Sequence, residues 1–265
     1  MHYSIDKLKI IIHGVKIEIV NLILKKLSCI IDKDLIYYES KAIIKCYHNF
    51  SYNGIYLGID NNWNKKFEKY YKNIVLEFNP NKTKLSSFPI NLQILFEDIR
   101  KIEVMCVDVA VDIEVPIQNL LILKTHENQR LNILSHSHIE TYYLGRFNES
   151  GFCRIYDKTK ESKLNYPLTR IEMHIKKLGF HGYFEQRIAE LNVPNIYMIK
   201  NDLEINATNK VLILACYQMP HLLLMLGKRR KNQIKELIRS NLEKVEIDKE
   251  SINKICYNIK EIFYE

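Results

Sequence analysis

Acidic residues alternate with small and branched apolar residues in the segment 106–113. Successive side chains of a β-strand point to opposite faces, so Asp108, Ala110 and Asp112 would share one face and the valines the other. Carboxylates on an otherwise apolar strand are unfavourable unless they meet a cation or solvent. Asp108 and Asp112 are therefore candidates to meet a cation, with a half-exposed strand whose acids face water as the alternative.

A tyrosine lies between two cations in the segment 154–158. Strand alternation would place Arg154, Tyr156 and Lys158 on one face. Two neighbouring cations would favour loss of the phenolic proton, and an aryloxide can attack phosphorus while the cations hold the phosphate. Tyr156 is therefore a candidate nucleophile, with Arg154 and Lys158 as candidate catalytic residues. Taken alone, this segment favours the alternative of a ring packed between two aliphatic stems, because the chain has 17 tyrosines.

A third segment of this kind spans residues 169–175 and carries Arg170, Glu172 and His174 at alternate positions. Glu172 and His174 would both suit a divalent metal, and Arg170 and His174 would contact DNA phosphates. A polar stripe that faces solvent is the alternative. If the three segments pair in one sheet, they form a single polar patch above a hydrophobic core.

The elements that must position these residues indicate an α+β fold. Apolar periodicity predicts strands at residues 3–13, 42–52, 54–58, 73–78, 103–115, 141–144, 152–156 and 168–176, and helices at 17–27, 89–99, 117–123 and 228–245. We expect a mixed, largely antiparallel sheet with helices packed on one side, followed by a helical C-terminal region. Residues 1–178 would form the catalytic domain, and residues 179–265 a helical region for DNA binding or dimerisation.

The composition is that of a globular protein with an excess of basic residues. Lys and Arg number 39 against 31 Asp and Glu, which gives a net charge of +8 and favours polyanions. The six cysteines are scattered without a CxxC pair, which argues against a zinc ribbon or a disulfide framework. The N-terminus is unlike a signal peptide, and the longest apolar run, 211–226, is interrupted and too short to span a membrane. We expect a cytoplasmic protein without a membrane partner.

Two further motifs are candidates for DNA or metal contacts. Lys228, Arg229, Arg230 and Lys231 begin a basic amphipathic helix that would bind a phosphate backbone, with a solvated helix start as the alternative. The pair His136 and His138 invites comparison with the paired histidines of HUH endonucleases. The intervening serine and an expected loop location favour an exposed loop instead.

The three segments resemble the Rep_trans family of rolling-circle plasmid replication initiators. That family has a D-x-A-x-D strand, a T-x-Y-x-G segment, an R-x-Y-x-K-x-x-E strand and a T-R-x-E strand. This chain has the same motifs in the same order, at residues 108–112, 141–145, 154–161 and 169–172, and the segment 76–82 resembles the strand and turn that precede them. The match covers about residues 70–178. A basic residue commonly precedes the first Asp in the family, whereas Cys106 and Val107 stand here.

The resemblance implies a nicking and joining enzyme. Tyr156 would form a 5′-phosphotyrosine bond and free a 3′-hydroxyl, while Asp108, Glu172 and either Asp112 or Glu161 would hold Mg²⁺ or Mn²⁺. The implied partners are origin DNA, a host helicase and a polymerase, and the resemblance leaves open whether the active form is a homodimer.

Other functions are weighed against this one. The chain lacks a P-loop and a G-x-S-x-G elbow, which argues against those chemistries. A relaxase of a conjugative element or a non-catalytic DNA-binding regulator on the same fold are the alternatives. Acids in a phosphate groove repel DNA unless a cation intervenes, which favours the enzyme.

Overall fold

The computed structural model describes residues 1–30, 36–37, 46–61, 69–97, 101–123, 131–136, 139–147, 149–180, 183–198, 206–218 and 222–263. The chain divides into two compact units whose segments alternate along the sequence. Unit 1 comprises residues 1–2, 111–173 and 192–248, and unit 2 comprises residues 3–110, 174–191 and 249–265. Strands β6 (Ile102–Ile113) and β11 (Thr169–Phe180) therefore contribute residues to both units. The expected division of function at residue 178 stays a prediction.

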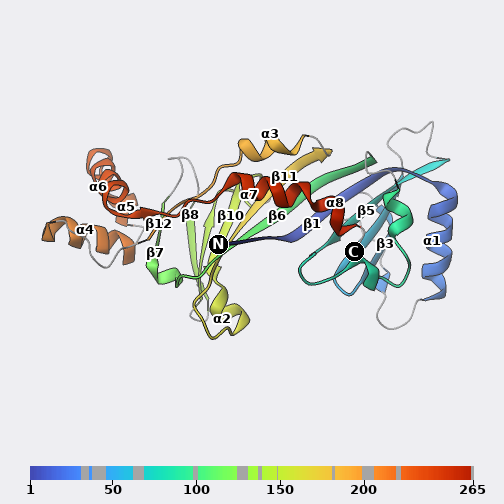
Figure 1. Ribbon diagram of the computed structural model, residues 1–265, viewed down its shortest axis with the longest axis horizontal. Coiled ribbons are helices and arrows are strands. Elements are labelled where there is room, and N and C mark those ends of the chain that lie inside the picture. The colour runs from blue at the N-terminus through green and yellow to red at the C-terminus, as the bar shows by residue number, and fades with distance from the viewer. Residues whose placement is uncertain are drawn as a thin grey trace. The chain divides into compact units, whose positions relative to one another are not determined.

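Unit 2 is built on a sheet whose strand order runs β2-β3-β4-β5-β1-β6-β11 (Figure 1). The pairings from β2 through to β1 are antiparallel. The hairpin between β3 and β4 turns at Asn53 and Gly54, whose φ angles of 48° and 78° suit a two-residue turn with both central residues left-handed. The strands that precede β6 are β1 (His2–Lys16), β2 (Ile36–Tyr37), β3 (Cys46–Tyr52), β4 (Ile55–Asn61) and β5 (Tyr71–Phe78).

Helices of unit 2 bury one apolar face each. Helix α1 (Ile17–Cys29) buries Val20, Ile23 and Leu27, which recur at helical spacing. Helix α3 (Phe184–Ala189) packs on α7 (Lys249–Tyr257), with the rings of Phe184 and Tyr257 edge to face at 6.0 Å. Helix α8 (Ile259–Ile262) follows α7 (Figure 1).

The helix predicted at residues 89–99 is wrong for the described residues of that segment. Two 3₁₀ turns stand in this region, η1 (Leu85–Ser87) and η2 (Gln93–Phe96). The backbone N–H of Gln93 donates to the side-chain oxygen of Asn91 at 2.9 Å. This local bond offers the backbone an alternative to α-helical bonding.

Unit 1 contains the strand order β6-β11-β10-β9-β8. Strands β8 (Leu131–His136) and β9 (Ile139–Leu144) pair antiparallel, so the loop expected around His136 is wrong at that residue, and residues 137–138 lie outside the described residues. Strand β10 (Phe152–Asp157) pairs antiparallel with β9, and this register places Tyr156 opposite Thr141. The T-x-Y-x-G and R-x-Y motifs are thus adjacent strands.

A smaller sheet in unit 1 has the order β13-β12-β7 and packs on helices. The helix predicted at residues 117–123 is wrong beyond its first turn: η4 (Ile117–Asn119) leads directly into β7 (Leu120–Leu123), which pairs with β12 (Asn195–Met198). Strand β13 (Glu243–Lys244) pairs on the other side of β12.

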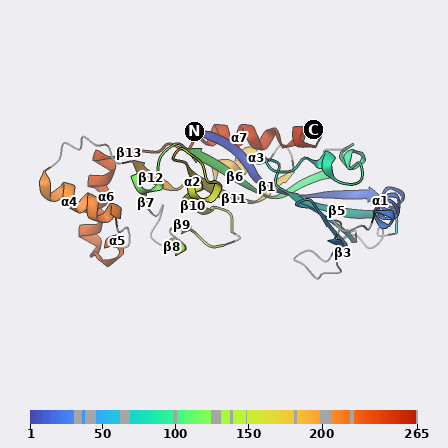
Figure 2. The same cartoon turned by 90° about the horizontal axis from the view of Figure 1, so that it is seen from below.

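Three helices complete this part of unit 1, and both views show α4 and α6 near β12 (Figures 1 and 2). They are α4 (Ala207–Gln218), α5 (Leu222–Met225) and α6 (Lys228–Asn241). Their common core includes Leu121, Ile213, Ile234 and Ile238. The basic helix predicted at 228–245 is confirmed, although it ends at Asn241.

The architecture confirms the α+β prediction, because antiparallel sheets and packed helices occur in the same chain. The strands expected around Tyr156 and Glu172 are present within a few residues of their expected bounds. None of the helices in the described part of the chain combines the length and apolarity that crossing a bilayer requires.

Candidate active site

The hydroxyl of Tyr156 donates a hydrogen bond to the carboxylate of Glu172. The two residues come from neighbouring strands β10 and β11, and the distance from the hydroxyl oxygen to Glu172 Oε1 is 2.6 Å. Both residues are largely buried, at 7% and 8% exposure. A phenol and a carboxylate at this distance can exchange a proton directly.

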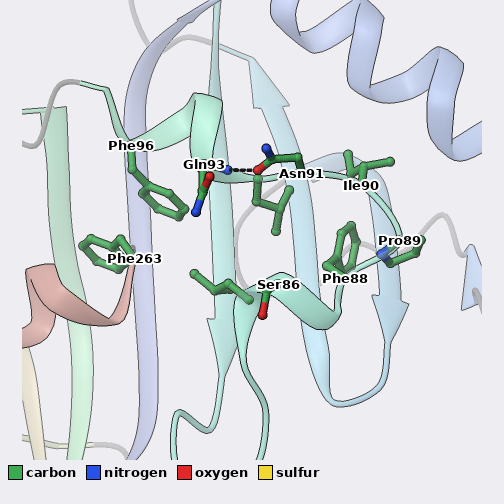
Figure 3. Close-up of a pocket in the computed structure, with 10 residues that line it drawn as sticks. Ser86, Phe88, Pro89, Ile90, Asn91, Gln93, Phe96 and Phe263 are labelled. Atoms are coloured by element: carbon green, nitrogen blue, oxygen red, sulfur yellow. Dashed lines mark hydrogen bonds between the residues drawn. The ribbon is translucent and has the colours of Figure 1, made fainter. Parts of the chain in front are cut away.

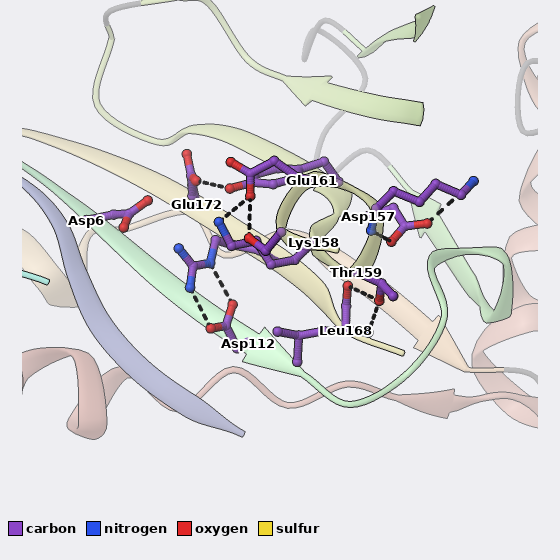
Figure 4. Close-up of polar contacts among 12 residues, drawn as sticks. Asp6, Asp112, Asp157, Lys158, Thr159, Glu161, Leu168 and Glu172 are labelled. Carbon is purple, nitrogen blue, oxygen red and sulfur yellow. Dashed lines mark hydrogen bonds and ion pairs between the residues drawn. The ribbon is translucent and has the colours of Figure 1, made fainter. Parts of the chain in front are cut away.

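The two predicted catalytic cations lie at the face of the Tyr156 ring. The guanidinium carbon of Arg154 is 5.1 Å from the ring centroid, and Lys158 Nζ is 5.8 Å from it. Arg154 also donates from Nε and Nη2 to Glu172 Oε2, the former at 2.9 Å. Lys158 forms an ion pair with Glu161 (Figure 4). The structure therefore brings together Arg154, Tyr156, Lys158, Glu161 and Glu172 within unit 1.

The prediction that the flanking cations make the Tyr156 phenol more acidic is wrong. Burial raises the pKa of Tyr156 most, and the hydrogen bond to Glu172 and the charges of Glu172 and Glu161 raise it further. Arg170 opposes this shift. The cations do not reverse it because each is paired with a carboxylate and lies over the ring rather than at the oxygen. The phenol is therefore protonated at neutral pH.

Lys158 reaches this site from a helix, so the prediction that it continues the strand is wrong. Asp157 ends β10 and caps α2 (Lys158–Ser162), accepting a bond from the backbone N–H of Lys160 at 3.1 Å. Thr159 fixes the helix, since its hydroxyl oxygen accepts from the N–H of Leu168 at 2.6 Å (Figure 4). Sequence analysis missed both positioning residues. An Asp is a preferred N-cap residue, so Asp157 was the available signal that a helix begins at Lys158.

Arg170 and Asp112 form a bidentate ion pair. Its Nε and Nη2 each donate to one oxygen of Asp112 at 2.7 Å, and both side chains are nearly buried (Figure 4). Thr169, which precedes Arg170, donates from its hydroxyl to the backbone oxygen of Val115 at 2.7 Å. These bonds tie the start of β11 to the end of β6 and to Val115, which follows β6.

Asp108 and His174 form a pair of their own in unit 2. His174 Nδ1 lies 2.5 Å from Asp108 Oδ1, and both side chains are partly exposed. Because these two residues and Tyr156 belong to different units, the prediction that Asp108 shares the tyrosine's site stays a prediction. The DNA contact assigned to His174 stays one as well.

The carboxylates near Tyr156 do not fit a divalent metal ion as they lie. Asp112, Glu161 and Glu172 each accept bonds from a cationic side chain. In the described part of the chain, no group of three or more Asp, Glu, His or Cys side chains is arranged to hold a metal. The predicted requirement for Mg²⁺ or Mn²⁺ stays a prediction, and the chemistry below uses the protein's own residues.

The basic residues predicted to bind DNA lie at the start of α6. Lys228, Arg229 and Arg230 are exposed and Lys231 is partly exposed, whereas Ile234 and Ile238 on the same helix are buried. The helix therefore packs by its apolar face and presents its cations to solvent. A role for His136 or His138 in metal binding is untested.

Comparisons with known proteins give a likeness to solved structures and no match of sequence. No family model matches the sequence, and no curated protein matches it. One solved structure similar to the chain is a rolling circle replication initiator protein from Geobacillus stearothermophilus. The identity is 14% and the TM-score 0.41, over 70% of this chain and 77% of that chain. A likeness at this level does not establish a shared activity, and membership of the Rep_trans family stays a prediction.

Proposed function

We propose that the protein initiates rolling-circle replication by nicking and rejoining one DNA strand, with Tyr156 as the nucleophile. The observation that carries the proposal is the 2.6 Å hydrogen bond from the Tyr156 hydroxyl to Glu172. A buried tyrosine that only packs its ring does not need a carboxylate as its acceptor, and a carboxylate is an acceptor that can also take the proton.

In the nicking step the phenolic oxygen of Tyr156 attacks a backbone phosphorus, and the bond from phosphorus to the 3′-oxygen breaks. The phenolic proton passes to Glu172 Oε1, and the departing 3′-oxygen takes a proton from solvent. The products are a 5′-phosphotyrosine and a free 3′-hydroxyl. Because the pKa of Tyr156 is raised, its proton leaves during the attack rather than before it, which is general base catalysis by Glu172. Rejoining reverses each transfer.

Arg154 is the residue best placed to hold the phosphate under attack. Its side chain is 44% exposed, whereas that of its partner Glu172 is 9% exposed. A guanidinium has five N–H donors, and the bonds to Glu172 use only those on Nε and Nη2, so others can face a phosphate oxygen. Lys158 would add positive charge on the same side of the ring.

Duplex or single-stranded origin DNA is the proposed substrate, with the basic start of α6 as a second contact. The net charge of +8 and the exposed cations of α6 support attraction of a polyanion. Mg²⁺ or Mn²⁺ as cofactor, a host helicase and polymerase as partners, and action in the cytoplasm remain parts of this proposal.

The test is incubation with supercoiled plasmid bearing the neighbouring non-coding DNA, followed by denaturing electrophoresis. We expect relaxed or nicked plasmid and a protein–DNA band that survives denaturant, both absent for Tyr156→Phe. Parallel reactions with Mn²⁺ and with chelator examine the metal requirement. A covalent band of undiminished yield in Tyr156→Phe would contradict the proposal.

A non-catalytic origin-binding protein is the second candidate, and the burial of Tyr156 at 7% exposure favours it. On that hypothesis Tyr156, Glu172 and Arg154 stabilise the sheet. The protein would then bind plasmid DNA without changing its topology or forming a covalent band under any metal condition. A relaxase of a conjugative element would use the same nicking step and differ only in the DNA sequence it selects.

A further inference from the structure

One face of strands β9 and β10 carries a row of aromatic side chains that leads away from Tyr156. Phe152 lies four residues before Tyr156 on β10, so strand alternation places both side chains on the same face. Tyr143 on β9 is paired with Arg154, and residues directly opposite each other in an antiparallel pair share a face. The row therefore runs from the candidate nucleophile past Arg154 to Tyr143 and Phe152.

The rings of this row contact one another and end at an exposed phenylalanine. The rings of Tyr143 and Phe152 are nearly parallel, with an interplanar angle of 22° and centroids 6.1 Å apart. Phe147, in the turn between the two strands, packs edge to face against Phe152 with the centroids 5.5 Å apart. Phe147 is 75% exposed, and the other two side chains are partly exposed. We call Tyr143, Phe147 and Phe152 the aromatic platform.

The turn that carries Phe147 has a defined backbone. The N–H of Phe152 donates to the backbone oxygen of Glu149 at 3.1 Å and closes the turn. Gly145 and Gly151 flank it with φ angles of 89° and 83°, a conformation that favours glycine. The backbone therefore presents the ring of Phe147 to solvent in a fixed place, where it extends the apolar surface of the two neighbouring rings.

An unpaired nucleobase is the ligand that suits these rings and the nearby cation Arg154. Aromatic side chains bind unpaired bases by stacking, while cations beside them attract the phosphate backbone. A strand rises about 3.3 Å per residue, so Phe152 lies about 13 Å along β10 from Tyr156. At the rise of about 3.4 Å per nucleotide in stacked DNA, this span is at most about four nucleotides. A DNA strand with a phosphate at Tyr156 therefore brings nearby bases to the platform.

We propose that the aromatic platform stacks unpaired bases of the DNA strand within a few nucleotides of the phosphate that Tyr156 attacks. This inference rests on the proposed function for the position of that phosphate. A base inside a duplex already stacks on its neighbours and presents only its edges, so the platform favours a strand that is locally unpaired. Phe147 is then a residue that positions the substrate and takes no part in the chemical step.

The experiment compares three fluorescent DNA probes by anisotropy with the full chain at constant ionic strength. They are a strand of thymidines, an abasic strand of the same length with the same phosphates but no bases, and a duplex of that length. Stacking of one base on one ring typically changes affinity about 5- to 150-fold. Phe147→Ala should lose affinity for the thymidine strand by a factor in this range. Its affinities for the abasic strand and the duplex should stay within about twofold of the wild type.

Three further variants distinguish stacking from a structural role. Phe147→Tyr keeps the ring and should bind the thymidine strand as the wild type does. Phe152→Leu removes a second ring and should weaken binding of the thymidine strand alone. The matched control is Tyr183→Ala, which removes a ring of unit 2 that is 67% exposed and does not belong to the platform. That control should change none of the three affinities.

The outcomes separate this inference from the proposed function. No loss of affinity in Phe147→Ala, or equal losses for the thymidine and abasic strands, overturns the inference, as does a wild type that binds these two strands equally. If a Tyr156-dependent covalent adduct still forms with plasmid, the nicking proposal stands without it. If the loss is confined to the thymidine strand but no adduct forms, base stacking stands and the nicking proposal fails.

Discussion

Two tyrosines in this protein donate hydrogen bonds of the same length to different acceptors. Tyr156 in unit 1 donates to the carboxylate of Glu172 at 2.6 Å, and Tyr56 on β4 in unit 2 donates to the amide oxygen of Asn49 at 2.6 Å. An amide oxygen is too weak a base to accept the phenolic proton, whereas a carboxylate can accept one in a transition state. The bond length alone therefore does not distinguish a structural tyrosine from a reactive one.

The two hydroxyls also differ in the charges around them. Arg154 and Lys158 lie over the ring of Tyr156, so a phosphate has cations to approach. The hydroxyl of Tyr56 belongs to a packed network with Asn49 and Cys46. Space there is tight, since a Cβ added at Gly58 would lie 2.6 Å from this hydroxyl. On the proposed function, the acceptor of the hydrogen bond and the charges over the ring distinguish the two tyrosines, whereas tyrosine count and burial do not.

The largest expected difference comes from removing each hydroxyl in turn. Tyr156→Phe should abolish the covalent protein–DNA band, because it removes the hydroxyl that attacks phosphorus in the proposed step. Tyr56→Phe should keep the band. Denaturing electrophoresis after reaction with plasmid measures both, and equal loss in the two variants would remove the distinction between the tyrosines.

Changing the acceptor of Tyr156 should lower the rate without removing the nucleophile. Glu172→Gln keeps a hydrogen-bond acceptor but no longer takes the proton, and general base catalysis typically contributes about 10²- to 10⁴-fold. Single-turnover adduct formation should slow by a factor in that range, while DNA affinity is retained. Glu149→Gln, an exposed acid paired with Arg146, is the matched control. A rate within twofold of the wild type would assign the proton to another acceptor.

The charged surroundings of Tyr156 should make unit 1 sensitive to loss of a buried acid. Asp112→Ala leaves Arg170 nearly buried without its two-bonded partner, and breaking such a pair typically costs about 3–5 kcal/mol of folding free energy. Urea unfolding followed by circular dichroism measures the change. A loss below about 1 kcal/mol, the range of exposed pairs, would mean that this pair is well solvated.

The neutral network around Tyr56 should respond to volume rather than to charge. Gly58→Ala would place a Cβ 2.6 Å from the Tyr56 hydroxyl and 2.7 Å from Cys46 Sγ, so both groups must shift. Overpacking of this kind typically costs about 1–3 kcal/mol. We expect lower thermal stability with adduct formation unchanged at temperatures where the variant is folded. Unchanged stability would show that the network has room to adjust.

The smallest effect is expected at a carboxylate whose partners are ammonium groups. Burial opposes ionisation of Glu77, but the hydrogen bond and charge of Lys7 and the charge of Lys9 lower its pKa below the ordinary value of 4.5. A lowered pKa gives stability that is present above the unfolded pKa and lost as pH falls through the folded one. Glu77→Gln should therefore reduce stability at pH 7 by less than about 1 kcal/mol and have less effect near pH 3. Urea midpoints at the two pH values test this. A destabilisation by Glu77→Gln that grows towards acid pH would contradict the prediction.

Strands were predictable from this sequence because their apolar residues alternate over long segments. The face shared by Arg170, Glu172 and His174 followed from the same rule, as did the turn at Asn53 and Gly54. The rule failed at Lys158, because the strand ends at Asp157 and this residue caps a helix that begins at Lys158. It failed again near Asn91, whose side chain bonds to the backbone and replaces helical bonding.

Pairings over long distances in the sequence could not be predicted in this way. The segment from Leu120 to Leu123 is a strand because Asn195 to Met198 pairs with it, and nothing within the segment distinguishes it from a buried helix. The partners of the candidate site residues were equally out of reach. Residue types indicated that Arg154 and Glu172 lie near Tyr156, but not that they bind each other and leave the phenol protonated.

The alternation of the two units along the chain has a consequence for synthesis. The last segment of unit 1 ends at residue 248, before the last segment of unit 2 begins. Phe263 in that later segment stacks on Phe96, with the ring centroids 4.6 Å apart. Both rings line a pocket of about 280 Å³ together with residues 85–86 and 88–93 (Figure 3). A nascent chain can therefore complete unit 1 first, while Phe96 of unit 2 stays uncovered until Phe263 has left the ribosome. During that interval the unfinished apolar surface is the place where a chaperone or an aggregating neighbour would bind.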